Sequence, residues 1–206
     1  MGINPNDAEA HYNLGNLLKN LKRFEEAEKE HREAIRLNYE EAEKEYREAI
    51  RINPNDAGAH TGLGYLLADL KRYIEAEEEY RKAIEINPNF AEAHYNLGIL
   101  WADLKRYDEA EKAYRKAIEI NQYYAKAHYS LGTLLEKLGR CEEAEEEYGE
   151  AIGVNRYYAI ARNNLKSLHK KIKEDGSYKE NHPIPQSNFE KILDRASDAL
   201  KRLVGL

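Results

Sequence analysis

The chain has 206 residues, of which 42% are apolar and 34% charged, and its formal net charge is −6. This is enough for one domain or a short repeat array, and the acidic balance argues against nucleic acid as a partner. No apolar run approaches the ~20 residues that cross a bilayer, and the single cysteine, Cys141, excludes an internal disulfide framework. A lone cysteine fits a reducing compartment, so we expect a cytoplasmic protein without membrane contacts.

A repeated phrase organises most of the chain. Asn-Pro-Asn-Asp-Ala begins at Asn4 and again at Asn53, and variants of it begin at Asn87, Asn121 and Asn155. From Asn53 onward the spacing is 34 residues, and each interval repeats Ala-x-Ala-His-x-x-Leu-Gly and then Ala-Ile near its end. A 34-residue period with two helical segments resembles the tetratricopeptide repeat (TPR) family.

The resemblance covers residues 4–173 and implies an all-α fold, a TPR α-solenoid in which helix hairpins stack as a right-handed superhelix. In this family the first helix of each hairpin lines the concave side. In chain order, we predict repeats at about residues 8–38, 57–90, 91–124 and 125–158. Each hairpin leaves an apolar stripe that only its neighbours cover, so stability is expected to come from stacking.

One departure from the family lies between Phe24 and Pro54. The second-helix sequence that starts at Phe24 recurs 15 residues later from Tyr39, so an extra second-helix copy, residues 39–52, has no first helix of its own. No Pro or Gly separates the copies, which favours one helix from about Arg23 to Ile52 over a break at Asn38 into two shorter helices.

A continuous helix would leave the apolar face of the extra copy without its usual partner. That face carries Ala42, Tyr46, Ala49 and Ile50. A second chain, the C-terminal tail or a ligand would have to cover it.

The C-terminal part forms the second departure. We predict a capping helix at residues 159–173, a linker at 174–186 that contains Pro183 and Pro185, and an amphipathic helix at 187–204. The last helix has an apolar stripe from Phe189 to Val204 that is expected to be buried. It either caps its own array or crosses to another chain.

No motif indicates catalysis. The four histidines in equivalent positions lie about one repeat apart, too far for one metal ion, and are expected to pack between helices: His11, His60, His94 and His128. The sequence contains no phosphate-binding glycine loop, and Cys141 has no triad context. We therefore predict no catalytic residue, no metal site, no cofactor and no enzymatic activity.

The concave face is the predicted binding site. Tyrosine rings offer contact area and asparagine amides can bond an extended backbone, as in peptide-binding grooves. The predicted groove residues are Tyr12, Asn13, Asn16, Tyr65, Tyr95, Asn96, Lys126 and Tyr129. The family's carboxylate clamp for acidic chaperone tails would need further cations and amides, but only Asn96 and Lys126 match it, so we expect no such clamp.

The leading hypothesis is a non-catalytic protein–protein interaction scaffold that binds an extended peptide or a helix of a partner protein. One alternative is a self-assembling structural protein, with a homodimer through residues 39–52 or 187–204. Another is an excised regulatory region of a larger enzyme, because the chain begins with what resembles the end of a preceding repeat.

Overall fold

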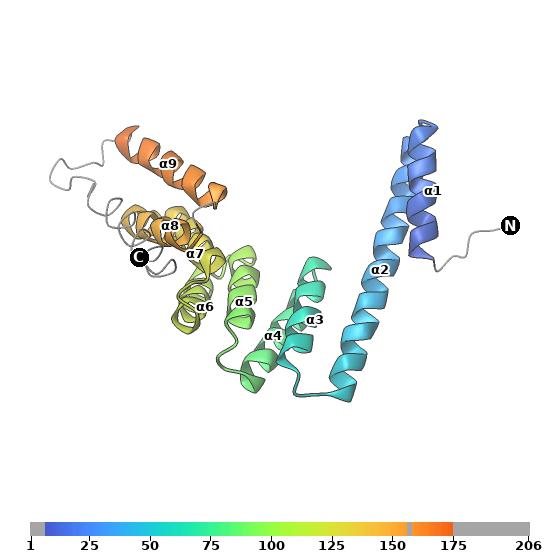
Figure 1. Ribbon diagram of the computed structural model, residues 1–206, viewed down its shortest axis with the longest axis horizontal. Helices are drawn as coiled ribbons and strands as arrows, with labels where there is room; N and C mark the ends of the chain where they lie inside the picture. The colour runs from blue at the N-terminus through green and yellow to red at the C-terminus, as the bar shows by residue number, and fades with distance from the viewer. Residues whose placement is uncertain (1–6, 156–157, 175–206) are drawn as a thin grey trace, which may run out of the picture. The chain divides into compact units, whose positions relative to one another are not determined.

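The computed structural model describes residues 7–155 and 158–174, and every regular element in these ranges is an α-helix (Figure 1). The helices are α1 (Ala8–Asn20), α2 (Phe24–Ile52), α3 (Ala57–Asp69), α4 (Tyr73–Ile86), α5 (Ala91–Asp103), α6 (Tyr107–Ile120), α7 (Ala125–Lys137), α8 (Cys141–Val154) and α9 (Ala159–Glu174). The predicted linker and the predicted helix at 187–204 lie outside the described residues, except that Glu174 still belongs to α9.

The chain divides into two compact units, one up to Pro88 and one from Asn89 on. In the first unit α1 pairs with α2, α2 packs against α3, and α3 pairs with α4. In the second unit α5 pairs with α6 and α7 with α8, while α9 packs on α8 as a lone first helix. Helix hairpins in sequence order are the arrangement that the repeat predicts.

Local sequence explains where the helices begin and end. The carboxylates of Asp7 and Asp56 accept hydrogen bonds from the backbone N–H of the third residue on and cap α1 and α3, both at 3.0 Å. Inside each hairpin the turn needs one residue with positive φ. Lysine fills it in three copies, with φ of 61° to 62°, and Gly139 fills it in the fourth, with φ of 77°.

The core lies between the helices of each hairpin. Leucines of the first helices and alanines of the second are almost fully buried, as shown by Leu63 at 1% exposure and Ala76 at 0%. The first-helix glycines provide room for tyrosine rings. A Cβ at Gly98 would lie 2.7 Å from a ring carbon of Tyr114, and Gly64 and Gly132 meet a tyrosine in the same way.

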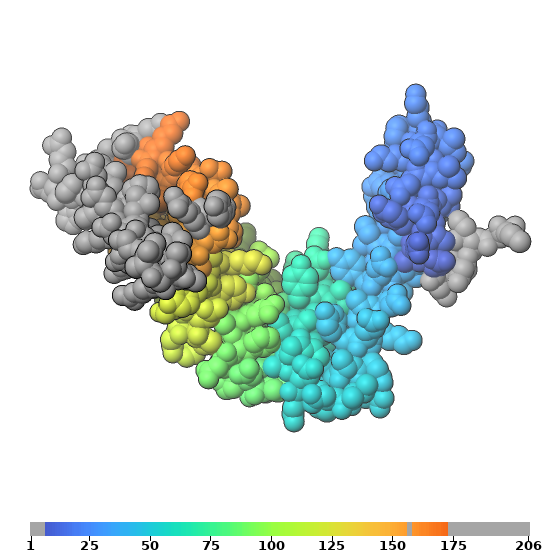
Figure 2. Space-filling view, in the orientation of Figure 1, coloured from blue at the N-terminus to red at the C-terminus, as the bar shows by residue number. Residues whose placement is uncertain are grey.

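The segment that the sequence left open is one unbroken helix, α2, of 29 residues. α1 packs against its first half, where Gly15 meets His31, and α3 packs against its second half, where Gly62 meets Tyr46. Figure 1 shows α1 and α3 on either side of α2. Figure 2 shows that α1 and the first half of α2 project beyond α3 and α4.

Candidate functional site

The first helices of the second unit carry a line of polar contacts from one repeat to the next. The hydroxyl of Tyr95 on α5 lies 3.4 Å from Oγ of Ser130 on α7. One repeat later, Nδ2 of Asn164 on α9 donates to the hydroxyl oxygen of Tyr129 on α7 at 3.3 Å. Each pair spans 35 residues, so the same contact joins successive first helices in the same register.

Aromatic contacts strengthen these joins. The rings of Tyr95 and Tyr124 have centroids 5.0 Å apart, and those of Tyr129 and Tyr158 lie 5.4 Å apart in an edge-on arrangement. The second tyrosine of each pair comes just before the next first helix. Burial raises the pKa of Tyr124 to about 12, which keeps its hydroxyl neutral over the physiological range. The tyrosines thus hold repeats together and keep only part of their surface for a ligand.

A residue that the sequence analysis did not select belongs to the same cluster. Tyr148 on α8 is fully buried, receives a hydrogen bond from Asn164 at 3.4 Å and donates one to Glu136 at 2.9 Å. Lys171 on α9 then pairs with the other carboxylate oxygen of Glu136 at 2.6 Å. Repeat position alone suggested that Tyr148 was a packing residue, and only its hydroxyl reaches the polar face.

The predicted groove residues lie in both units. In the second unit, Tyr95, Asn96 and Tyr129 are half-buried and Lys126 is exposed. In the first unit, Tyr12 on α1 is 56% exposed and Tyr65 on α3 is 64% exposed. The α1 residues, which include Asn13 and Asn16, lie on the helix that packs against the first half of α2, whereas α3 packs against the second half. The contacts that join predicted groove residues to the next first helix are those of the second unit.

Family models match most of this region. Models described as TPR repeat match residues 38–71 and 64–104, and models described as tetratricopeptide repeat match residues 8–38, 91–124 and 113–146. The chain belongs to the tetratricopeptide repeat family. The resemblance drawn from the sequence and the all-α solenoid fold are therefore confirmed.

Solved TPR structures share the fold at low identity. The crystal structure of MamA has 20% identity and a TM-score of 0.60, and the match covers 85% of this chain and 96% of MamA. The first TPR of Spaghetti (RPAP3), bound to the HSP90 peptide SRMEEVD, has 23% identity and a TM-score of 0.55 over 57% of this chain and 93% of that domain. YrrB, described as a TPR protein with an unusual peptide-binding site, has 23% identity and a TM-score of 0.50 over 95% and 87%. A search of curated proteins gave no match.

The repeated TPR histidines form ion pairs inside the hairpins. Nδ1 of His60 lies 2.6 Å from Glu79, and Nδ1 of His128 lies 2.7 Å from Glu147. The other ring nitrogen of His128 lies 3.1 Å from the carbonyl oxygen of Gln122. Both partners of His128 accept hydrogen bonds, so both ring nitrogens carry a proton and the ring is an imidazolium. Among the described residues no group of His, Cys, Asp or Glu side chains could hold a metal ion.

The His128 pair predicts a pH dependence of stability. Burial lowers the pKa of His128, but hydrogen bonds with Glu147 and the Gln122 carbonyl outweigh burial, so the pKa is raised. A raised folded-state pKa stabilises the fold fully below the unfolded value of about 6.5, and this contribution is lost as pH rises through the folded value. The stability difference between the wild type and His128→Gln should therefore shrink from about pH 5.5 to about pH 9. Denaturant titrations at several pH values measure it, and a constant difference would contradict the assignment.

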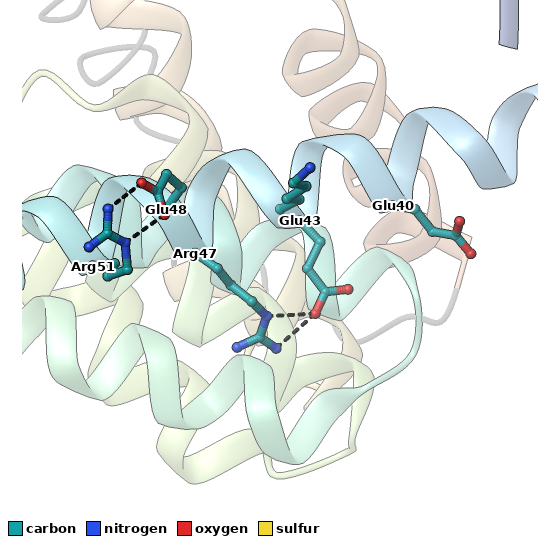
Figure 3. Close-up of a pocket in the computed structure, with 6 residues that line it drawn as sticks. Glu40, Glu43, Arg47, Glu48 and Arg51 are labelled. Carbon is teal, nitrogen blue, oxygen red and sulfur yellow. Dashed lines mark hydrogen bonds and ion pairs between the residues drawn. The ribbon is translucent and has the colours of Figure 1, made fainter. Parts of the chain in front are cut away.

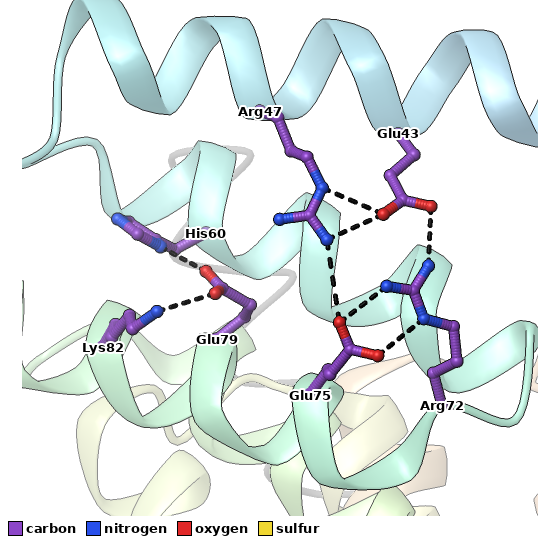
Figure 4. Close-up of polar contacts among 7 residues, drawn as sticks. All are labelled: Glu43, Arg47, His60, Arg72, Glu75, Glu79 and Lys82. Atoms are coloured by element: carbon purple, nitrogen blue, oxygen red, sulfur yellow. Dashed lines mark hydrogen bonds and ion pairs between the residues drawn. The ribbon is translucent and has the colours of Figure 1, made fainter.

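The turn arginines of the TPR hairpins bind the preceding second helix. Nη1 of Arg72 donates to Glu43 at 2.7 Å, while Nε and Nη2 of the same guanidinium bind Glu75 at 2.7 and 2.6 Å (Figure 4). Burial raises the pKa of Glu43, but the hydrogen bonds from Arg47 and Arg72 outweigh burial, so the pKa lies below its ordinary value. In the second unit Arg140 binds Glu111 at 2.5 Å in the same way. The second half of α2 thus joins α3 and α4 as an ordinary second helix would.

The hollows found in the first unit are shallow surfaces of α2. One, of about 480 Å³, is lined only by α2 side chains: Glu40, Glu43, Lys44, Arg47, Glu48 and Arg51. Figure 3 shows Arg47 paired with Glu43 and Arg51 with Glu48. Paired charges on one helix do not enclose a small molecule. No described helix has the length and apolarity that a membrane span requires.

Proposed function

We propose that the face of α5, α7 and α9 binds an extended peptide or a helix of a partner protein, and that the protein is a non-catalytic scaffold in the cytoplasm. TPR repeat proteins are generally non-catalytic scaffolds, and TPR domains of the same fold bind peptides. The observation that carries the proposal is the register of Tyr95 with Ser130 and of Tyr129 with Asn164. It supports a row of half-buried rings and polar groups that repeats along the array.

The chemistry of this row favours an extended ligand with an acidic group. Half-buried rings offer apolar area without the cost of a flexible side chain, and the amide of Asn96 can both donate to and accept from a peptide backbone. Lys126 is exposed and has no ion-pair partner among the described residues. A carboxylate on the ligand would provide that partner, although the departures from the chaperone clamp still argue against a clamp ligand.

Replacing both Asn96 and Tyr129 with alanine should weaken a true ligand by ~1–3 kcal/mol, because a buried hydrogen bond and an aromatic anchor are lost. Peptides selected from a random display library would serve as probes, and calorimetry would give the affinities. Lys112→Ala on the exposed side of α6 is the control for a surface truncation and should leave affinity unchanged.

Tyr129 also packs against Tyr148 and Tyr158, so the double variant must keep its circular dichroism spectrum for the result to count. Lys126→Ala, which removes only an exposed side chain, provides an independent measurement on the same face. Unchanged affinity in both variants would rule out this face as the binding site.

Self-assembly is the second candidate function. It is favoured by one observation on the extra second-helix copy: Tyr46 is 36% exposed, whereas its equivalents Tyr80, Tyr114 and Tyr148 are 0% to 3% exposed. A tyrosine that the other repeats bury is left partly open where the first helix is missing.

A further inference from the structure

The first half of α2 has an uncovered outer face. Phe24 is 63% exposed and Ile35 is 54% exposed, and the side chain of Glu28 is 63% exposed. The equivalent of Glu28 in the second half is Glu43, which is only 20% exposed because Arg72 of the next hairpin binds it. The first half therefore presents the face on which a following repeat would normally stack.

The second half of α2 has a different uncovered face. Its Ala42 and Ala49 are half-exposed, whereas Ala76 and Ala83, their equivalents in α4, are both at 0%. In α4 these alanines are covered by α3, the first helix of the same hairpin. The second half of α2 therefore presents the face that its own first helix would normally cover.

These two faces align along one side of α2. Fifteen residues at ~100° per residue amount to four turns and about 60°, which turns the second face onto nearly the same side as the first. The positions that follow this side alternate in steps of four and three residues, as in a helix that packs along another helix. They are Phe24, Glu28, His31, Ile35, Asn38, Ala42, Glu45, Ala49 and Ile52, which we call the α2 stripe.

The helices packed on α2 leave this stripe accessible. α1 contacts the first half and α3 the second half, on either side of α2 (Figure 1). A hollow of about 360 Å³ lies along the first half and includes Phe24, Glu28, His31 and Ile35 of the stripe in its lining. Shallow space beside exposed large side chains suits an incoming helix better than a small molecule.

We propose that the α2 stripe is a dimer interface and that its occupant is the α2 stripe of a second copy, running antiparallel. A first helix runs antiparallel to its second helix in every hairpin, so an antiparallel α2 supplies the element that the extra copy lacks. A two-fold axis near Asn38, the midpoint of α2, does this for both copies at once. The inference rests on the self-assembly candidate and does not involve the peptide-binding face of α5, α7 and α9.

The side chains favour the antiparallel direction. The first half of the stripe offers the large apolar residues Phe24 and Ile35, and the second half offers the small residues Ala42 and Ala49. Antiparallel packing sets large residues against small ones, whereas parallel packing would set Phe24 against Phe24 and alanine against alanine. A 29-residue seam is about four heptads long, which is enough to hold a coiled-coil pair.

The oligomeric state of the full chain tests the interface. Light scattering coupled to size exclusion should give a dimer at tens of micromolar, and Ile35→Glu and Ala42→Glu should each raise the dimer dissociation constant at least ~10-fold. Both positions are at least partly exposed, so the monomer should remain folded. Lys44→Glu, on the opposite side of α2, is the matched control and should leave the dimer intact.

Cysteine cross-linking tests the direction. In a Cys141→Ser background, Asn38→Cys lies at the two-fold axis and should form a disulfide-linked dimer. Phe24→Cys should not, because two Phe24 positions would lie about 42 Å apart across an antiparallel pair. Cross-linking of both would show a parallel pair and overturn the proposed geometry.

Three results would overturn the interface itself: a monomeric wild type, a dimer that both glutamate variants leave intact, and a dimer that is lost only when residues 175–206 are deleted. Peptide binding measured on Ile35→Glu separates this inference from the scaffold function. Because the variant leaves α5, α7 and α9 unchanged, it should bind selected peptides as the wild type does.

Discussion

Replacing Asn38 with proline is expected to cost about 3 kcal/mol or more in the free energy of unfolding. Proline at this point removes a helical hydrogen bond and places its ring against the carbonyl of Ala34, a residue that is 3% exposed where α1 packs on α2. The break would separate the α1 hairpin from the half of α2 that binds α3. Circular dichroism should show lost helix, and denaturant titration should give the free energy.

The control for this variant is Asn38→Ala. Alanine keeps the backbone bond and has the higher helix propensity, so the stability should stay the same or rise by about half a kcal/mol. If proline were tolerated as well as alanine, the two copies would have to be separate helices joined by a loop at residue 38.

Replacing Leu131 with alanine is expected to cost about 2–5 kcal/mol, because it opens a cavity in the best-packed part of the second unit. Leu131 on α7 has 0% exposure and lies in a cluster with Leu135, Ala144 and Tyr148. Tyr148 also bonds the polar face through Asn164 and Glu136. Loss of Leu131 should therefore weaken peptide binding as well as stability.

Leu138→Ala is the matched control. Leu138 follows α7 and is 38% exposed, so its truncation should cost less than about 1 kcal/mol. Thermal melts of the two variants give the comparison, and equal losses would mean that the leucine cluster does not form the core of this unit.

The helices and their order could be predicted from the sequence because the repeat contains both the hydrophobic spacing and the breaks. Proline or asparagine phrases separate the hairpins, and the missing phrase near residue 38 predicted the long helix. Burial of Leu63, Leu97 and Leu131 also follows from their common position in the first helices.

The polar contacts could not be predicted in the same way, because they join residues that meet only after the hairpins form. His128 and Glu147 are 19 residues apart, and Tyr129 and Asn164 are 35 apart. A signal existed for the first kind: the 19-residue pairing recurs as His11 with Glu30 and His60 with Glu79. In the third copy Ala113 occupies the position of the glutamate, so no single repeat contains the rule.

The turn residues were also missed. The motif Leu-Lys-Arg gives no sign that its lysine adopts positive φ, since most residues in that region are glycine or asparagine. Only the fourth copy, with Gly139, uses the residue that backbone sterics favour. Comparison of the four turns would have suggested that Lys22, Lys71 and Lys105 share the conformation of that glycine.

The duplicated half of α2 also shows how a repeat array can branch without a new fold. Removing residues 38–52 would join Leu37 directly to Asn53 and restore the 34-residue interval between the first two Asn-Pro-Asn-Asp-Ala phrases. Glu28 would then occupy the position of Glu43, within reach of Arg72, and the projecting α1 hairpin would become an ordinary first repeat. One tandem copy of fifteen residues is therefore sufficient to convert a member of the stack into a side arm, and its loss would reverse the change.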